Sequence, residues 1–356
     1  MRVVICGAGV IGACTAYFLG LRGVEVTVVE RTGVACAASG KSGGFLALDW
    51  CGGTALDRLA RRSFALHAEL AATIDGSRWG YRRLNTWSVA AGHAGGARRD
   101  AAAPDWLGAG AVVQGQLGTP ATSAQVHPGR FTEAMLQAAV GHGARLLSGR
   151  VTGIGLDAAS GAVASVQVGA QAIEADAVVI AMGPWSMAAC RWLPLPPVFG
   201  LKGNSVLFRN EVAISPDALF VELAAGDTPE VFPRDDGTTY VCGLSSQQAL
   251  PGDPAEVAPD AGAREALREM TRAFAPGLAA CPITVTQACF RPVTQDGLPL
   301  LGPVPGVAGA FVATGHSVWG ILNAPASGEA LAELIVDGAT RAVDLRRFSP
   351  ARLSPG

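Results

Sequence analysis

Closely spaced glycines near the start of the chain constrain its fold more strongly than any other feature. Gly7, Gly9 and Gly12 follow an apolar, β-branched segment at residues 2–6 and precede a second apolar run at residues 13–22. This pattern predicts a buried strand, a tight turn and a helix. Glycines at such a turn let the backbone approach a pyrophosphate, which then lies at the helix N-terminus.

An acidic residue strengthens this interpretation. A second strand is predicted over residues 24–30, and Glu30 ends it, where a carboxylate would accept hydrogen bonds from an adenosine ribose. A carboxylate there also disfavours the 2′-phosphate of NADP. A glycine-rich turn that binds nothing is the alternative, but it does not account for the acid. The motif alone does not decide between FAD and NAD.

Composition limits the remaining classes of protein. The chain has 356 residues, 49% of them hydrophobic, which favours two domains. A net charge of −2 without a long basic cluster argues against nucleic-acid binding. The eight cysteines form no Cys-x-x-Cys pair, so neither a metal site nor a disulfide framework is predicted.

The uncharged stretch at residues 3–21 imitates a membrane span or a signal peptide. Because glycines interrupt it at a turn spacing, a strand, a turn and a buried helix explain it better, and we expect no membrane span. The chain begins directly on the first predicted strand, and its last three residues are not a peroxisomal address. We therefore expect a cytoplasmic protein.

The rest of the chain alternates between predicted helices and strands. Residues 33–53 and 76–125 show no clear period, and the second of these segments is left unassigned. Apolar patterns predict further helices at residues 54–74, 128–140, 259–274 and 323–336. They predict further strands at residues 145–156, 162–168, 171–174, 177–181, 204–208, 218–223, 238–242, 283–290 and 310–313.

Four later segments resemble, in order, the family of D-amino-acid oxidase, glycine oxidase and sarcosine oxidase. They are Ala38–Phe45, Val178–Trp185, Phe290–Gly302 and Gly315–Gly320. The stretches Ser39–Cys51 and His316–Pro325 further resemble a little-characterised subgroup of fungal and plant oxidoreductases.

The resemblance implies an α/β fold, α+β overall, of the glutathione-reductase-2 type. A Rossmann-like FAD-binding domain would comprise residues 1–60, 126–200 and 290–356. A substrate domain with a mixed or antiparallel sheet would be inserted as residues 61–125 and 201–289. The residues that it implies for FAD binding are Gly7, Gly9, Val10, Ile11, Gly12, Glu30, Arg31, Ser39, Gly40, Lys41, Gly43, Gly44, Phe45, Val151, Gly183, Trp185, Arg291, Gly315, His316, Val318, Trp319, Gly320 and Ile321.

Two of these residues are the candidates for catalysis. Arg291 matches the family arginine that pairs with a substrate carboxylate, and a guanidinium can bind both oxygens at once. His316 is expected near the flavin, either in contact with substrate or in a structural role. Lys202 occupies a family position near the inter-domain strands that usually holds a basic residue; facing the active site is one alternative, but a salt-bridged surface lysine is the interpretation that we favour.

The mode of cofactor attachment has two alternatives. Cys289 precedes Asp296 at the spacing at which monomeric sarcosine oxidases bind FAD covalently. Since covalent attachment needs an activated thiolate and most small buried cysteines are inert, we expect non-covalent FAD. The chain has three tyrosines, so it lacks the tyrosine-rich substrate pocket of some relatives.

The resemblance implies an FAD-dependent oxidase or dehydrogenase that acts on the C–N bond of a small amine or amino acid. The flavin would accept a hydride, the imine would hydrolyse, and O2 or another acceptor would reoxidise the flavin. An NAD-dependent dehydrogenase would explain only the first motif. A non-catalytic flavin-binding scaffold stays open, because a fold does not imply a function.

Overall fold

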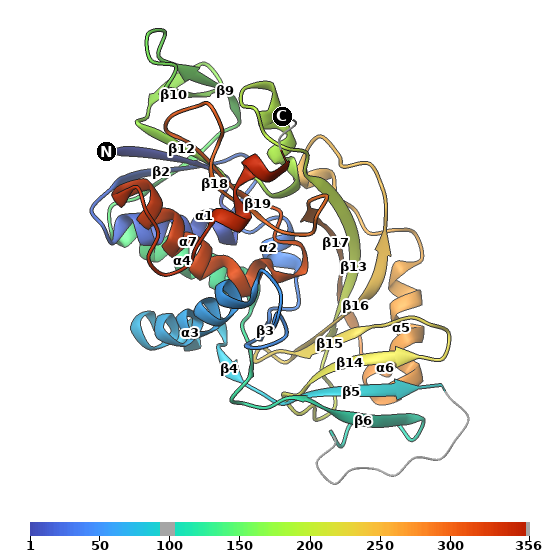
Figure 1. Ribbon diagram of the computed structural model, residues 1–356. Helices are drawn as coiled ribbons and strands as arrows, with labels where there is room; N and C mark the ends of the chain where they lie inside the picture. The colour runs from blue at the N-terminus through green and yellow to red at the C-terminus, as the bar shows by residue number, and fades with distance from the viewer. Residues whose placement is uncertain (93–103, 354–356) are drawn as a thin grey trace.

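Two β-sheets of different construction organise the chain (Figure 1). The computed structural model describes residues 1–92 and 104–353. Part of the unassigned segment 76–125 and the C-terminal tripeptide lie outside the described residues.

The first sheet has six strands in the order β18-β19-β12-β1-β2-β8, and all neighbours are parallel except β18 and β19. The chain passes from β1 to β2 on one side and returns as β12 on the other, so a crevice opens at the carboxyl end of β1. The strands are β1 (Arg2–Cys6), β2 (Glu25–Glu30), β8 (Arg145–Ser148), β12 (Ala177–Ile180), β18 (Leu300–Pro303) and β19 (Ala310–Thr314).

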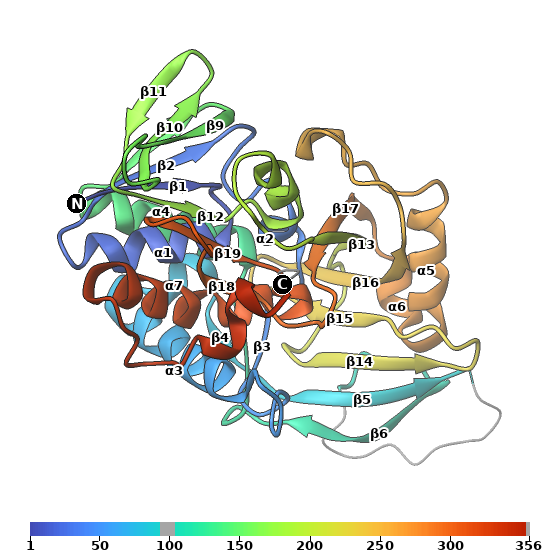
Figure 2. The same cartoon turned by 45° about the horizontal axis from the view of Figure 1, so that its top comes forward.

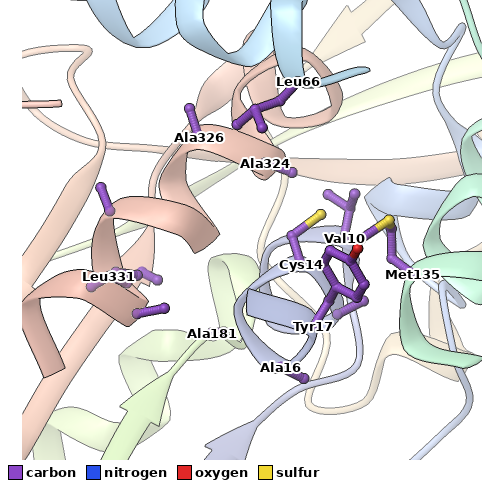
Figure 3. Packing of buried hydrophobic residues seen from close by; sticks show 14 of the residues in the cluster. Val10, Cys14, Ala16, Tyr17, Leu66, Met135, Ala181, Ala324, Ala326 and Leu331 are labelled. Carbon is purple, nitrogen blue, oxygen red and sulfur yellow. The ribbon is translucent and has the colours of Figure 1, made fainter. Parts of the chain in front are cut away.

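Helices cover one face of this sheet, and the largest hydrophobic core lies between them (Figure 3). They are α1 (Val10–Gly20), α3 (Asp57–Ile74), α4 (Pro128–Gly141) and α7 (Gly320–Asp337). Tyr17 of α1 lies beside Met135 of α4, and Leu66 of α3 beside Ala326 of α7. Gly328 lets α7 approach α1, since a Cβ there would lie 2.7 Å from the carbonyl carbon of Cys14.

A proline inside α7 is accommodated by the side chains of α3. Pro325 has no N–H, so the carbonyl of Ile321 loses its helical donor. His67 Nε2 lies 3.0 Å from that carbonyl oxygen and replaces the missing donor. Ser63 Oγ accepts a hydrogen bond of 3.1 Å from the N–H of Ala326. The first turns of α7 therefore depend on α3 for their hydrogen bonding.

The second sheet has seven strands in the order β17-β13-β16-β15-β14-β5-β6, antiparallel except for the β14–β5 pair. Its strands are β5 (Thr86–Ala91), β6 (Ala111–Gly118), β13 (Phe199–Arg209), β14 (Ala218–Leu223), β15 (Glu230–Pro233), β16 (Thr238–Ser246) and β17 (Ile283–Val293). Helices α5 (Ala263–Phe274) and α6 (Pro276–Ala280) cover its outer face (Figure 2). Leu219 and Val221 pack toward these helices, so Phe220 points the opposite way, toward the first sheet.

Two small sheets complete the architecture. One contains β9 (Val151–Leu156), β10 (Val163–Val168) and β11 (Gln171–Glu174). The other contains β3 (Phe45–Ala47), β4 (Arg82–Arg83) and β7 (Ser123–Gln125), and it follows the short helix α2 (Ala38–Lys41). In the described residues, no helix is both long enough and apolar enough to cross a membrane.

The predicted class, α/β with a second and mainly antiparallel sheet, is confirmed. The predicted strand at residues 145–156 is two strands, because the chain leaves the first sheet at Gly149 and enters the small one. β18 lies in a segment that we expected to be turns only. The domain limits stay a prediction, and α3, which we placed in the substrate domain, packs in the core of the first sheet.

Candidate active site

A cavity of about 730 Å³ lies between the two sheets and receives residues from both. On one side it reaches the carboxyl end of β1 and the N-termini of α1 and α7. On the other side it is lined by the strands β13 to β17 of the second sheet. The crevice that the topology creates and the inner face of the second sheet therefore form one site.

The first glycine turn has no room for side chains. Gly7 has φ +109°, and a Cβ there would lie 2.5 Å from the carbonyl oxygen of Ala181. Gly7 and Gly9 line the cavity, together with Val10 and Ile11. Gly12 does not line the cavity. It lies where the helix packs closely on the preceding turn, since a Cβ at Gly12 would lie 2.0 Å from the carbonyl oxygen of Gly7.

Glu30 lies at the end of β2 and supports this turn. Its Oε2 accepts a hydrogen bond of 2.9 Å from the N–H of Ala8, and its Oε1 one of 2.9 Å from the N–H of Thr32. Oε1 also accepts a longer hydrogen bond of 3.4 Å from the N–H of Gly33, whereas Oε2 has a second lone pair that can accept a further hydrogen bond. Glu30 and Arg31 both line the cavity.

The second glycine segment meets the first turn directly. Ser39 Oγ accepts a 2.9 Å hydrogen bond from the N–H of Val10. Gly44 has φ +79°, and Gly43 is so close to the second sheet that a Cβ would lie 2.2 Å from the ring of Phe232. Ser39, Gly43, Gly44 and Phe45 line the cavity.

Three other predicted residues do not line the cavity. Gly40 packs against the backbone of Ala35, and Gly315, with φ +80°, packs against Thr294. Lys41 contributes its carbonyl oxygen to a 3.3 Å hydrogen bond from Gln287. The remaining predicted residues all line the cavity: Val151, Gly183, Trp185, Arg291, His316, Val318, Trp319, Gly320 and Ile321.

His316 lines the cavity where β19 leads into α7, but it is buried. Its Nε2 lies 3.0 Å from Ser327 Oγ, and its Nδ1 has no partner in the part of the chain that the structure describes. Burial lowers the pKa of His316 to about 3, so the imidazole is neutral at physiological pH. The next residue, Ser317, adopts φ +51°, which is uncommon without glycine and typical of constrained sites.

Arg291 crosses the inner face of the second sheet from β17. Its Nη2 lies 2.5 Å from Ser245 Oγ on β16, and it passes over Gly203 of β13. A Cβ at Gly203 would lie 3.2 Å from Nη2, so the absence of a side chain at this position leaves room for the guanidinium. The side chain is half-buried and open to the cavity.

The expectation for Lys202 is wrong in one respect. It forms a salt bridge of 2.5 Å with Asp260, but it is buried rather than on the surface. Asp260 also accepts a hydrogen bond of 2.9 Å from Asn204 Nδ2. The Lys202–Asp260 ion pair connects the segment 247–262 to β13. Nearer the start of this segment, Arg31 Nη2 donates a hydrogen bond of 3.0 Å to the carbonyl of Gly252.

No sequence motif marked the most distinctive group in the cavity. Glu230 of β15 lines it together with an aromatic wall formed by Phe45, Trp50, Phe220, Phe232, Tyr240 and Trp319. In this wall the ring centroids of Phe45 and Phe220 are 5.2 Å apart, and those of Trp50 and Phe220 4.7 Å. The only local signal was that Glu230 and Phe232 flank Val231 in a strand. Because every second residue of a strand shares one face, this pattern places Glu230 and Phe232 on the same face.

Two glycine turns at a switch point between parallel strands define a dinucleotide-binding protein. A family model described as FAD dependent oxidoreductase (DAO) matches residues 2–334, and the chain belongs to this family. The match also makes an NAD-dependent dehydrogenase the weaker alternative.

A protein of Schizosaccharomyces pombe described as an oxidoreductase is 29% identical over 385 residues, covering 98% of this chain and 97% of that protein. The solved structure of glycine oxidase from Geobacillus kaustophilus has a TM-score of 0.81 at 25% identity and covers 99% of both chains. That of L-proline dehydrogenase from P. horikoshii has a TM-score of 0.79 at 19% identity, over 99% of this chain and 97% of that one, and it shows likeness of fold alone.

FAD, which the family implies, is compatible with the residues present. Gly9, the residue before α1, has no side chain to cap the helix, and although Ser39 Oγ accepts the N–H of Val10, the helix start lines the cavity where an anion can bind. Gly7 and Gly9 present bare backbone to the cavity. His316 presents a buried nitrogen that has no partner among the described residues.

Proposed function

We propose that this chain uses FAD to oxidise the C–N bond of a small amine or amino acid. The observation that carries the proposal is the position of Arg291, whose guanidinium faces the same cavity as both glycine turns. Such a group can bind both oxygens of a carboxylate and so orient the neighbouring carbon. The likeness to glycine oxidase of Geobacillus kaustophilus, whose name gives an amino acid as its substrate, supports an amino-acid substrate.

The cofactor would be held mainly by backbone. The turn at Gly7 and Gly9 and the start of α1 would face the pyrophosphate, and Glu30 the adenosine ribose. The second glycine segment and the start of α7 would surround the flavin. When bound, FAD supplies a hydride acceptor, whose electrons pass to O2 or another acceptor.

The other candidates receive narrower roles. His316 stays neutral, so it would hold a hydrogen bond to the cofactor or substrate rather than exchange protons. Burial raises the pKa of the Cys289 thiol, against smaller opposing effects of Arg291 and Lys41. A protonated thiol is a poor nucleophile, which supports non-covalent FAD.

The test uses the purified protein under anaerobic conditions. Its visible spectrum should show flavin bands, and acid precipitation should release the flavin into the supernatant. A panel of amino acids and amines should then bleach those bands, after which O2 and artificial acceptors are compared. A yellow protein that no amine or amino acid bleaches would instead support the non-catalytic scaffold. Cell fractionation would test the expected cytoplasmic location.

A further inference from the structure

Glu230 is an acidic group with few partners of its own. It projects from β15 into the cavity, between Phe220 on β14 and Cys242 on β16. Within the described residues, its side chain has one hydrogen-bond partner, the thiol of Cys242 at 3.7 Å from Oε2. A thiol is a weak donor, and a carboxylate has about four acceptor sites. A half-buried carboxylate with so few donors, facing a cavity, is suited to bind a donor that enters it.

The surroundings of Glu230 are apolar. Phe232, two residues along the same strand, lies 5.7 Å from Phe220 and 6.1 Å from Tyr240 between ring centroids. Burial raises the pKa of Glu230, and the charge of Arg291 partly opposes this effect. The carboxyl group is therefore a stronger base than a glutamate in water.

Glu230 and Arg291 offer opposite charges to one ligand. The guanidinium contacts Ser245 on β16, and Glu230 lies on the neighbouring strand β15. The two contact points are offset along the sheet, because Ser245 lies three residues along β16 from Cys242, the partner of Glu230. Both side chains line one cavity, and the charge of Arg291 acts on Glu230. No ion pair joins them within the described residues, so one ligand can place a carboxylate at Arg291 and an amino group toward Glu230.

The other titratable groups that face Glu230 do not change charge near neutral pH. Burial raises the pKa of the Cys242 and Cys289 thiols and of the Tyr240 phenol. Burial also lowers the pKa of His316, across the cavity, to about 3. Arg291 keeps its positive charge throughout. Among the described residues that line this end of the cavity, Glu230 is thus the group that can exchange a proton with a ligand, while Glu222 of β14 lines a separate hollow beside it.

We propose that Glu230 binds the ammonium group of an amino-acid substrate and accepts its proton. The inference rests on the function proposed above. In this step an N–H bond of the ammonium breaks and an O–H bond forms on the carboxylate, without any change of oxidation state. An ammonium and a carboxylate become two neutral groups, which an apolar cavity favours. Only the neutral amine has the free lone pair that hydride removal from the adjacent carbon requires.

The decisive experiment measures anaerobic flavin reduction by an amino acid in the Glu230→Gln variant as a function of pH. Glutamine keeps the size and hydrogen bonding but accepts no proton. At neutral pH the rate should fall about 100-fold. It should then recover about tenfold per pH unit, because the free amine becomes available from solution. The matched control is Glu133→Gln, an exposed glutamate on α4 outside the cavity lining, which should behave as wild type.

A second measurement separates loss of function from misfolding. Benzoate has a carboxylate but no amino group, so it should still perturb the flavin spectrum of Glu230→Gln, with equal or higher affinity. Reduction of this variant at the wild-type rate and with the wild-type pH profile would overturn the proposal. An equal loss at every pH would overturn the proton transfer. If no amine or amino acid reduces wild-type flavin, the proposed function itself fails, and this inference fails with it.

Discussion

On the side of the first sheet the glycine turns present backbone to the cavity, as at Gly7, Gly9 and Gly43, whereas on the side of the second sheet side chains such as Glu230 and Arg291 face it. Backbone surfaces need glycine, since a Cβ at Gly7 or Gly43 would collide with neighbouring atoms. A cavity surface made of side chains requires only that every second residue of a strand faces the cavity, and many residue types can occupy such positions. Damage to the first side should therefore remove the cofactor, and damage to the second should change the substrate.

The largest effect is expected at Gly7. The substitution Gly7→Ala combines a positive φ with a Cβ 2.5 Å from a carbonyl oxygen, so the turn must move. The ratio of bound flavin to protein should fall more than about tenfold. Gly141→Ala is the control, because a Cβ has open space there. Normal flavin content in Gly7→Ala would show that this turn does not hold the cofactor.

The complementary change is Arg291→Ala on the second sheet. It should lower kcat/KM for a carboxylate substrate about 100-fold, equivalent to about 3 kcal/mol, chiefly through KM. Flavin content should stay at the wild-type level. Steady-state kinetics with an amino acid and with the corresponding amine that lacks the carboxylate provide the check. An equal loss with both substrates would contradict carboxylate binding at Arg291.

Helix α7 connects the two kinds of lining, because its start lines the cavity while its hydrogen bonding depends on side chains of α3. His67→Leu removes the donor to the Ile321 carbonyl and should cost about 1–3 kcal/mol of unfolding free energy. Adding Pro325→Ala restores an N–H that can reach the same carbonyl, so the double variant should recover part of the loss. Denaturant unfolding of both variants measures this. If Pro325→Ala does not improve the stability of His67→Leu, the replacement role of His67 is wrong.

The smallest effect concerns the segment 247–262 over the second sheet. The hydrogen bond from Lys202 holds the pKa of Asp260 below its usual range, helped by Asn204 and Gln248. A depressed pKa stabilises the fold above about pH 4, and this contribution is lost as the pH falls through the folded-state pKa. Asp260→Asn should therefore be about 1–2 kcal/mol less stable at pH 7. The difference from wild type should shrink in acid unfolding curves below about pH 4.

The same contrast explains what could be predicted from the sequence. Gly7, Gly9 and Glu30 were identifiable because a dinucleotide-binding turn permits few residue types at a fixed spacing, whereas Ser39 was found only through a resemblance. No motif of fixed spacing identified Glu230, because its neighbours Phe220 and Cys242 come from other strands. Strand pairing between segments distant in sequence cannot be obtained from local periodicity. Arg291 was found only through a resemblance, and its contact with Ser245 required the register of β16.

The proline in α7 has a consequence for how the protein is made. His67 and Ser63 leave the ribosome long before Pro325, and the polar atoms that they bind do not exist until the last part of the chain has been synthesised. Until then, the N-terminal helices lack α7 as a packing partner, and the cavity lacks the start of that helix. A nascent chain can thus complete this cavity only after its C-terminal helix has been released, and we expect flavin to bind after translation.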